Sequence, residues 1–323
     1  MVVIGCSLPP PAQAADPAYG PPSRMCTVTD PRLAESSGLV VDGSRLLTVN
    51  DGGDALEVFV LDGSCRVTSV ITSPVDPYDV EDLARAADGT LWLADTGDND
   101  RDRDTVALHA LREDGQSVLF RFTYPDGRHD AEALLLDPAG RPYLLTKEPL
   151  GRAGIYTPST APSAESSTPL ERVGELELLP TGTPGGPLGE IGQVLITGAA
   201  VSPDGALAVV RTYTDAYVYA VPDGDVLAAL AAEPVRVALP TATQGEAIAF
   251  AANGRDLVVS SEGVPFDITL VPALAPSAST AAPSPTGSAS DAEDGNSPGT
   301  NLAIAAVLAA VLVGVYGVSR RRR

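Results

Sequence analysis

A short sequence pattern returns five times along the chain and constrains the fold more than any other feature. Each copy has a polar or acidic residue, a short apolar run, a turn, and a second apolar run that ends in polar or charged residues. The copies align at positions 35, 81, 132, 198 and 246, so the steps are 46, 51, 66 and 48 residues. A period in this range, with four short strands per copy, is typical of a β-propeller.

The copies contain enough short strands to predict the fold class. Runs rich in β-branched and aromatic residues alternate with Asp-Gly, Asn-Gly and Ala-Gly turns, as β-hairpins require. The fifth copy has a third run at 266–271 but no fourth run before a Pro/Ser-rich tract. We predict that residues 24–29 supply the missing outer strand, which removes the open sheet edge. The expected fold is an all-β propeller of five blades with four antiparallel strands each; residues 158–195 leave open a long insertion or an irregular sixth blade.

Acidic residues recur at similar places in the repeat. In a propeller the innermost strands begin, and the next strands end, around one mouth of the central channel, so these acids should converge there. The predicted metal ligands are Glu35, Asp51, Glu81, Asp95 and Glu132. Hard cations prefer such oxygen ligands, and the expected ion is Ca²⁺. The alternative is that the carboxylates accept backbone N–H bonds in the turns and bind no metal.

Charge and the C-terminal sequence bound the partners and the location. The chain has 42 acidic and 21 basic residues, a net charge of −21 that argues against nucleic-acid binding. Residues 274–300 are rich in Ala, Pro, Ser and Thr and predict an extended stalk. Residues 302–318 carry no charge and arginines follow at 320–323, which predicts a single transmembrane helix at 301–319 with a basic cytoplasmic tail. We expect a monomer anchored in the cell membrane, with the propeller, residues 25–273, outside the cytoplasm.

The N-terminal residues 1–24 are read as a signal peptide and leader. Ala12-Gln13-Ala14 followed by Ala15 fits a signal-peptidase site, although no positive region precedes the short apolar stretch, so the true start can lie upstream. A lipoprotein processing site at Cys6 is the alternative. Export to an oxidising compartment favours a disulfide between the two remaining cysteines, Cys26 and Cys65, over two free thiols.

Several phrases of the repeat resemble those of a known family. They are Glu35-Ser-Ser-Gly-Leu, Asn50-Asp-Gly-Gly-Asp, Asp79-Val-Glu-Asp, Asp95-Thr-Gly-Asp-Asn, Asp130-Ala-Glu-Ala-Leu and Thr146-Lys-Glu. Over about residues 26–270 they resemble exported bacterial propellers related to the β-propeller phytases and the "esterase-like activity of phytase" group. The resemblance implies Ca²⁺ ligands at Glu35, Asp51, Glu81 and Glu132, and an anionic group held by Lys147 and Arg211. The fourth copy departs from the pattern, with Thr197-Gly198 in place of the acid.

Two functions from different classes follow. The main prediction is a membrane-tethered, calcium-binding module that binds a small-molecule anion or a cell-surface partner without chemistry. The alternative is a Ca²⁺-dependent, phytase-like hydrolase of phosphoesters or esters that uses a metal-activated water. The chain has no Gly-x-Ser-x-Gly, His-Glu-x-x-His or Gly-rich Lys phosphate loop, so no catalytic residue is assigned. Of the two histidines, His109 is read as a structural strand residue and His129 as a polar loop residue.

Overall fold

A computed structural model of the protein describes residues 19–274. This part of the chain contains twenty strands and very little helix: α1 (Val226–Leu230) and two 3-10 turns, η1 (Pro31–Leu33) and η2 (Pro222–Gly224). The predicted all-β class is confirmed.

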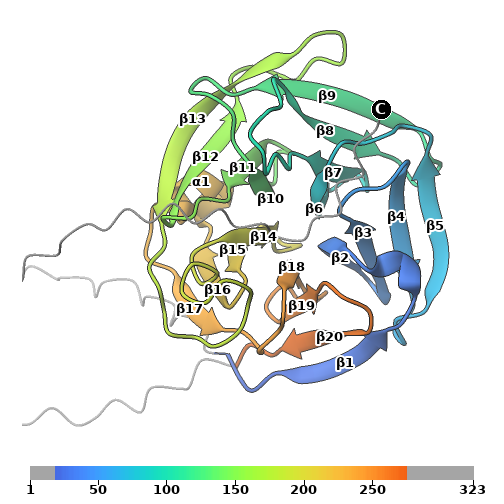
Figure 1. Ribbon diagram of the computed structural model, residues 1–323, viewed down its shortest axis with the longest axis vertical. Helices are drawn as coiled ribbons and strands as arrows, with labels where there is room; N and C mark the ends of the chain where they lie inside the picture. The colour runs from blue at the N-terminus through green and yellow to red at the C-terminus, as the bar shows by residue number, and fades with distance from the viewer. Residues whose placement is uncertain (1–18, 275–323) are drawn as a thin grey trace, which may run out of the picture. The chain divides into compact units, whose positions relative to one another are not determined.

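Five four-stranded antiparallel units lie around a central axis (Figure 1). The first unit contains β2 (Ser36–Asp42), β3 (Arg45–Asn50), β4 (Leu56–Leu61) and β5 (Val67–Ser73). The second contains β6 (Val80–Arg85), β7 (Leu91–Asp95), β8 (Val106–Leu111) and β9 (Ser117–Thr123). The third contains β10 (Ala131–Leu136), β11 (Pro142–Thr146), β12 (Arg152–Pro158) and β13 (Thr168–Glu177). The fourth contains β14 (Ile196–Val201), β15 (Leu207–Thr212), β16 (Asp215–Ala220) and β17 (Val235–Ala238), and the fifth contains β18 (Gly245–Phe250), β19 (Leu257–Ser261), β20 (Phe266–Val271) and β1 (Ser23–Val28).

The innermost strands β2, β6, β10, β14 and β18 pack against one another around the axis. Glycine permits one of these close approaches, because a Cβ atom on Gly38 would lie 2.5 Å from the backbone nitrogen of Leu83. The fully buried carboxylate of Asp82, on β6, accepts the N–H groups of Leu134 at 2.8 Å and Ala199 at 3.2 Å. It thereby ties β6 to β10 and β14, and buried apolar side chains fill the space between the units.

The N-terminal strand completes the last unit. β1 pairs antiparallel with β20, with Val28 opposite Phe266, and covers what would otherwise be an open sheet edge. A disulfide joins Cys26 on β1 to Cys65 in the turn after β4, with Cα atoms 5.7 Å apart. The hydrogen bonds complete the fifth unit, and the disulfide links it covalently to the first unit.

The longest step of the repeat is an insertion between the third and fourth inner strands. Within 158–195, β13 pairs with β12 and also, in parallel, with β9, where Thr168 lies opposite Phe122. This second pairing joins the second and third units into one eight-stranded sheet. The rest of the insertion is rich in Pro and Gly, which disfavour strands, and the described residues form no sixth four-stranded unit.

The membrane prediction is corrected. No helix within residues 19–274 is long and apolar enough to cross a membrane. The predicted transmembrane helix at 301–319, the basic tail at 320–323 and the stalk from residue 275 lie outside the described residues, as does the leader up to residue 18. The single-pass location at the cell membrane and the membrane as a partner through a C-terminal helix have no support from the structure. The boundaries of these terminal segments stay predictions.

Candidate metal centre

A local irregularity at the start of the inner strands positions the acids of the repeat. The ladder of β6 pairs Val80 and Asp82 with consecutive residues of β7, which leaves Glu81 as an extra residue. Glu132 is the extra residue of β10 in the same way. A β-bulge re-aims the side chain at the extra position. Two glutamates from neighbouring units are thus brought to one end of the inner strands.

The bulges correct the alignment of the repeat. Counted from the residue opposite the end of the second strand, the equivalent positions are Ser37, Glu81, Glu132, Thr197 and Glu246. The first and fourth units therefore carry a hydroxyl side chain where the other three carry a glutamate. The sequence pattern aligned Glu35 and Gly198 with Glu81, but in the structure they lie at other positions of the repeat. The pattern of residue types does not show where a strand has a bulge.

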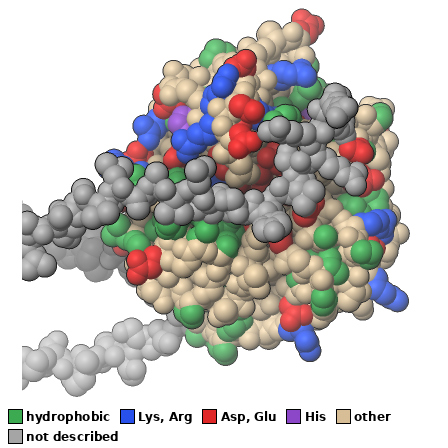
Figure 2. All heavy atoms as spheres, in the orientation of Figure 1, with side chains coloured by type: hydrophobic (Ala, Val, Ile, Leu, Met, Phe, Trp, Pro, Cys, Tyr) green, Lys and Arg blue, Asp and Glu red, His purple; other side chains and the backbone are tan. Residues whose placement is uncertain are grey.

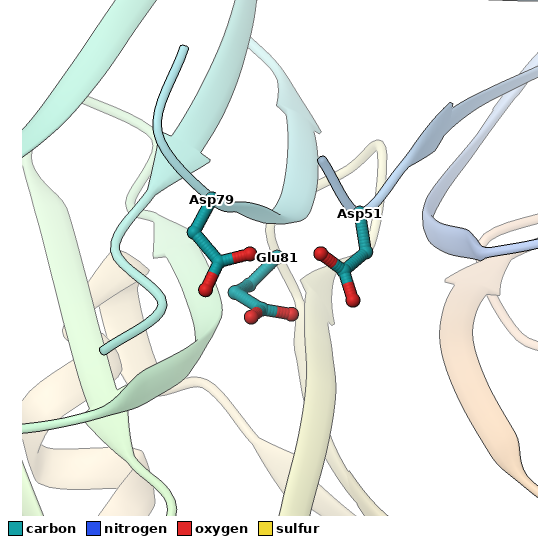
Figure 3. A group of neighbouring side chains, drawn as sticks. All are labelled: Asp51, Asp79 and Glu81. Atoms are coloured by element: carbon teal, nitrogen blue, oxygen red, sulfur yellow. The ribbon is translucent and has the colours of Figure 1, made fainter. Parts of the chain in front are cut away.

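Two groups of three carboxylates meet at this mouth and share Glu81. The oxygens of Asp51, Asp79 and Glu81 lie within 4.8 Å of one another, and so do those of Glu81, Asp130 and Glu132. Figure 3 shows the carboxylates of the first group directed toward a common point. We call these five residues the acidic cluster. Three adjacent units supply them, from the end of β3 and from the starts of β6 and β10, and Figure 2 shows acidic side chains near the middle of this face.

Gly97 leaves room for the acidic cluster. A Cβ atom at this position would lie 2.3 Å from Oδ2 of Asp79 and 2.3 Å from Oε1 of Glu81. No side chain fits there while the two carboxylates keep these positions. The absence of a side chain lets the acids converge, which is the arrangement that a cation with oxygen ligands requires.

Burial determines the protonation of the acidic cluster. The pKa of Asp79 is raised to about 9, first by burial and then by its hydrogen bond with Asp51. Burial raises the pKa of Glu132 to about 7, and burial together with the charge of Glu132 raises the pKa of Glu81 well above its ordinary value. The pKa of Asp130 is also raised by burial. The cluster therefore retains protons at neutral pH unless a cation compensates its negative charge.

Lys147 brings one permanent positive charge to the edge of the acidic cluster. Its Nζ lies 2.8 Å from Oε1 of Glu132 and 5.2 Å from the centre of the Tyr213 ring. Burial alone would lower the pKa of Lys147, but the carboxylates of Glu132 and Glu246 raise it well above its ordinary value. The side chain is therefore cationic and bound to a carboxylate.

The structure does not bring three of the predicted site residues into the acidic cluster. Glu35 lies at the surface and is exposed. Its pKa is raised, first by partial loss of solvent and second by the charge of Asp51. Asp95 accepts hydrogen bonds from Arg103 and from the backbone N–H of Asp79. Arg211 is 1% exposed, and its guanidinium donates to backbone carbonyls of Ala247 and Ser260. Buried among carbonyl oxygens, Arg211 supports the inner strands, and this geometry does not fit the expected role of holding an anion.

Sequence reasoning missed Asp79 and Asp130 as candidate ligands. A signal for them is present, because Asp79-Val80-Glu81 and Asp130-Ala131-Glu132 share the spacing Asp-x-Glu across the start of an inner strand. Each aspartate precedes its strand by one residue, and the bulge then turns the glutamate to the same side. His129 beside Asp130 is held by Asp126 at 3.1 Å and stays outside the acidic cluster.

Comparisons with known proteins give the chain no family. No family model and no curated protein matches it. Among solved structures, a gluconolactonase from Xanthomonas campestris is 15% identical over 74% of this chain and 73% of its own, with a TM-score of 0.43. A candidate 6-phosphogluconolactonase from Bacteroides uniformis is 15% identical over 79% of this chain and 68% of its own, with a TM-score of 0.40. These scores are too low to support an inference about activity.

The resemblance to phytase-like propellers is corrected by these comparisons. Neither of the two structures is a phytase, and no family model supports the short phrases on which the resemblance rested. In this chain the repeated phrase Asp-x-Glu marks the start of the bulged inner strands β6 and β10. The predicted membrane-tethered binding module is corrected as well, because its anchor has no support.

Proposed function

We propose that the protein is a five-bladed β-propeller that hydrolyses an ester bond with the help of Ca²⁺ bound to the acidic cluster. The observation that carries the proposal is the acidic cluster itself, in which two sets of three carboxylates share Glu81 and Gly97 leaves room beside them. Donor sets made only of carboxylate oxygens suit hard cations such as Ca²⁺ better than thiol- or imidazole-seeking metals. Enclosed carboxylates with raised pKa values are also typical of sites where charge is used for function.

The acidic cluster is assigned to the cation, and Lys147 beside it is assigned to the substrate. Asp51, Asp79 and Glu81 would hold the cation, with Asp130 and Glu132 completing the set from the next unit. A divalent cation in such a place polarises the carbonyl of an ester and lowers the pKa of a water molecule. Lys147, whose Nζ lies 2.8 Å from Glu132, would stabilise the negative charge that develops on an ester oxygen. Lactones are cyclic esters and belong among the substrates to be tested.

The test is hydrolysis of p-nitrophenyl acetate and of simple γ- and δ-lactones by the purified protein. Activity should be absent after chelation and return when Ca²⁺ is added. Glu81→Gln keeps the size of the side chain but removes the shared carboxylate, so it should abolish the calcium-dependent rate. Glu177→Gln, on the exposed end of β13, is the matched control and should retain it. Hydrolysis that is equal with chelator and with calcium would contradict the proposal.

A further inference from the structure

Exposed aliphatic side chains gather on two neighbouring segments of the third and fourth units. The segments are the turn 147–151 between β11 and β12 and the insertion 178–195 that precedes β14. The exposed fractions are 87% for Leu150, 67% for Leu179, 40% for Leu188 and 46% for Ile191. These four are half of the large apolar side chains that are exposed within 19–274, so they are concentrated here rather than scattered. We call them the apolar rim.

The two segments that carry the apolar rim contact each other. The N–H of Leu178 donates to the carbonyl of Gly151 at 2.7 Å. A Cβ atom on Gly151 would also lie 3.1 Å from the Cβ of Val194, near the end of the insertion. Leu150 and Leu179 are the next residues on the two bonded segments, so they lie beside each other at this edge.

Buried polar contacts fix the insertion on both sides of its rim residues. The carboxylate of Asp215 accepts the hydroxyl of Thr181 at 2.7 Å and that of Thr183 at 2.8 Å. Oε1 of Gln193 accepts the backbone N–H of Thr181 at 2.8 Å, which ties the beginning of the insertion to its end. The rim side chains between these anchors are therefore presented by a segment that is held in place.

Leu188 of the apolar rim has a backbone conformation that suits glycine or asparagine better. Its φ is +68°, in the left-handed region that a residue with a branched side chain rarely adopts. The side chain nevertheless stays 40% exposed, so it gains little from packing within the fold. A strained residue with an exposed apolar side chain indicates a use in binding rather than in stability.

The apolar rim adjoins the acidic cluster through Lys147. The Nζ of Lys147 contacts Glu132, and Leu150 follows three residues later, so the Cα atoms of Lys147 and Leu150 are at most about 11 Å apart. A Cβ atom on Gly186, in the insertion, would lie 2.9 Å from the Cβ of Tyr213. The ring of Tyr213 in turn lies 5.2 Å from the Nζ of Lys147. Both segments of the rim therefore pass beside this lysine.

Charge and size limit what can cover the apolar rim. The net charge of −21 disfavours a second copy of the chain and an anionic lipid surface. A stable protein–protein interface uses roughly 20–30 residues on each side, many more than the rim offers. An uncharged alkyl chain is not repelled by the negative protein, and its chemistry matches that of the aliphatic side chains.

We propose that the apolar rim binds the alkyl chain of an ester or lactone whose carbonyl lies at the acidic cluster. Substrates with a long alkyl chain are then preferred over short ones, because only the long chain reaches the rim. The role of this ligand as a substrate rests on the proposed hydrolase function, whereas its binding can be measured without any turnover.

The first test is equilibrium dialysis of the chelator-treated, full-length protein against γ-decalactone and γ-butyrolactone. The two compounds share the lactone ring, and γ-decalactone adds a hexyl chain. The chelator prevents calcium-dependent hydrolysis, so binding alone is measured. γ-Decalactone should bind at least about tenfold more tightly, since burial of two methylene groups already gives a factor of that size. Equal affinity for the two lactones, or binding of neither, overturns the proposal.

Substitutions at exposed positions locate the site. Leu150→Ser combined with Leu179→Ser should lower the affinity for γ-decalactone to that for γ-butyrolactone. Leu274→Ser is the matched control and should bind normally, because Leu274 is 49% exposed and follows the end of β20 that pairs with the start of β19, away from the acidic cluster. Thermal unfolding midpoints should be equal, since all three side chains are exposed. A folded double variant that still binds γ-decalactone as tightly as the unaltered protein means that the rim is not the site.

Hydrolysis in the presence of Ca²⁺ separates this proposal from the hydrolase proposal. KM should be lower for p-nitrophenyl octanoate than for the acetate, and the double variant should raise KM for the octanoate alone, with kcat unchanged. If γ-decalactone binds at the rim but no ester is hydrolysed, the rim keeps its ligand and the hydrolase proposal is wrong. If esters are hydrolysed with the same KM for long and short chains, the hydrolase proposal stands and the rim proposal is wrong. A double variant that dissociates a dimer without changing lactone affinity assigns the rim to a contact between copies, which also contradicts the proposal.

Discussion

At the scale of the residue, Gly97 is the position where one added carbon has the largest expected effect on the acidic cluster. Gly97→Ala would place a methyl group against Asp79 and Glu81, so at least one carboxylate must move. Calcium affinity should fall by about 10- to 100-fold, the usual cost of disturbing the shell around metal ligands. Calorimetric titration of the chelator-treated protein with Ca²⁺ measures this directly.

Gly63→Ala is the matched control for Gly97→Ala. It adds the same methyl group in an exposed turn, where a Cβ atom would meet nothing within 4 Å. Its calcium affinity should equal that of the unaltered protein. If the two variants bind calcium equally well, Asp79 and Glu81 do not act together as ligands.

At the scale of the element, Asp95 at the end of β7 fixes the segment that leads into β6. Its carboxylate accepts the backbone N–H of Tyr78 at 3.2 Å and of Asp79 at 3.0 Å, besides the side chains of Arg103 and His109. It therefore positions a candidate ligand without being one. The sequence predicted Asp95 as a metal ligand. In the structure both of its oxygens instead accept hydrogen bonds from protein groups.

Asp95→Asn should both destabilise the fold and weaken calcium binding. An amide has one acceptor oxygen and no charge, so Arg103 loses its buried partner, at a cost of about 3–5 kcal/mol. Denaturant unfolding gives the loss of stability, and calcium titration gives the loss of affinity. Asp62→Asn removes an equally arginine-paired carboxylate from an exposed turn and should change neither. An Asp95→Asn protein with unaltered calcium affinity would show that Asp79 does not need this support.

At the scale of the whole molecule, the raised pKa values predict how stability depends on pH and calcium. The pKa is about 7 for Glu132 and Glu262, about 8 for Asp82 and about 9 for Asp79. Ordinary carboxyl groups of the unfolded chain titrate near pH 4. Between about pH 4 and pH 9 the folded protein therefore binds more protons than the unfolded chain, and its stability falls as the pH rises.

Calcium should oppose this loss. It competes with the protons of the acidic cluster, so it should raise the unfolding midpoint more at pH 8 than at pH 5. At a free concentration 100 times its dissociation constant the gain is about 2.7 kcal/mol. Thermal unfolding from pH 5 to pH 9, with chelator and with Ca²⁺, measures both effects. If calcium does not change the unfolding midpoint at pH 8, the acidic cluster does not bind calcium.

Local patterns in the sequence determined the all-β class, the order of the short strands and the presence of Glu81 and Glu132 at the starts of inner strands. Strand alternation, turn residues and repeat spacing are properties of neighbouring residues, so they can be read without coordinates. The same patterns indicated that 266–271 lacked an outer neighbour.

Only the tertiary structure decided which acids meet. Asp79 and Asp130 join the acidic cluster because two bulged strands from different units lie side by side, while Asp95 is used by Arg103 and His109. Arg211 was expected to hold an anion because of its place in the repeat, yet its guanidinium donates to carbonyls of β18 and β19. These outcomes depend on contacts between residues distant in the chain and on a one-residue bulge. A bulge changes the direction in which the side chain of the extra residue points, but the sequence around it keeps the same pattern of apolar and polar residues.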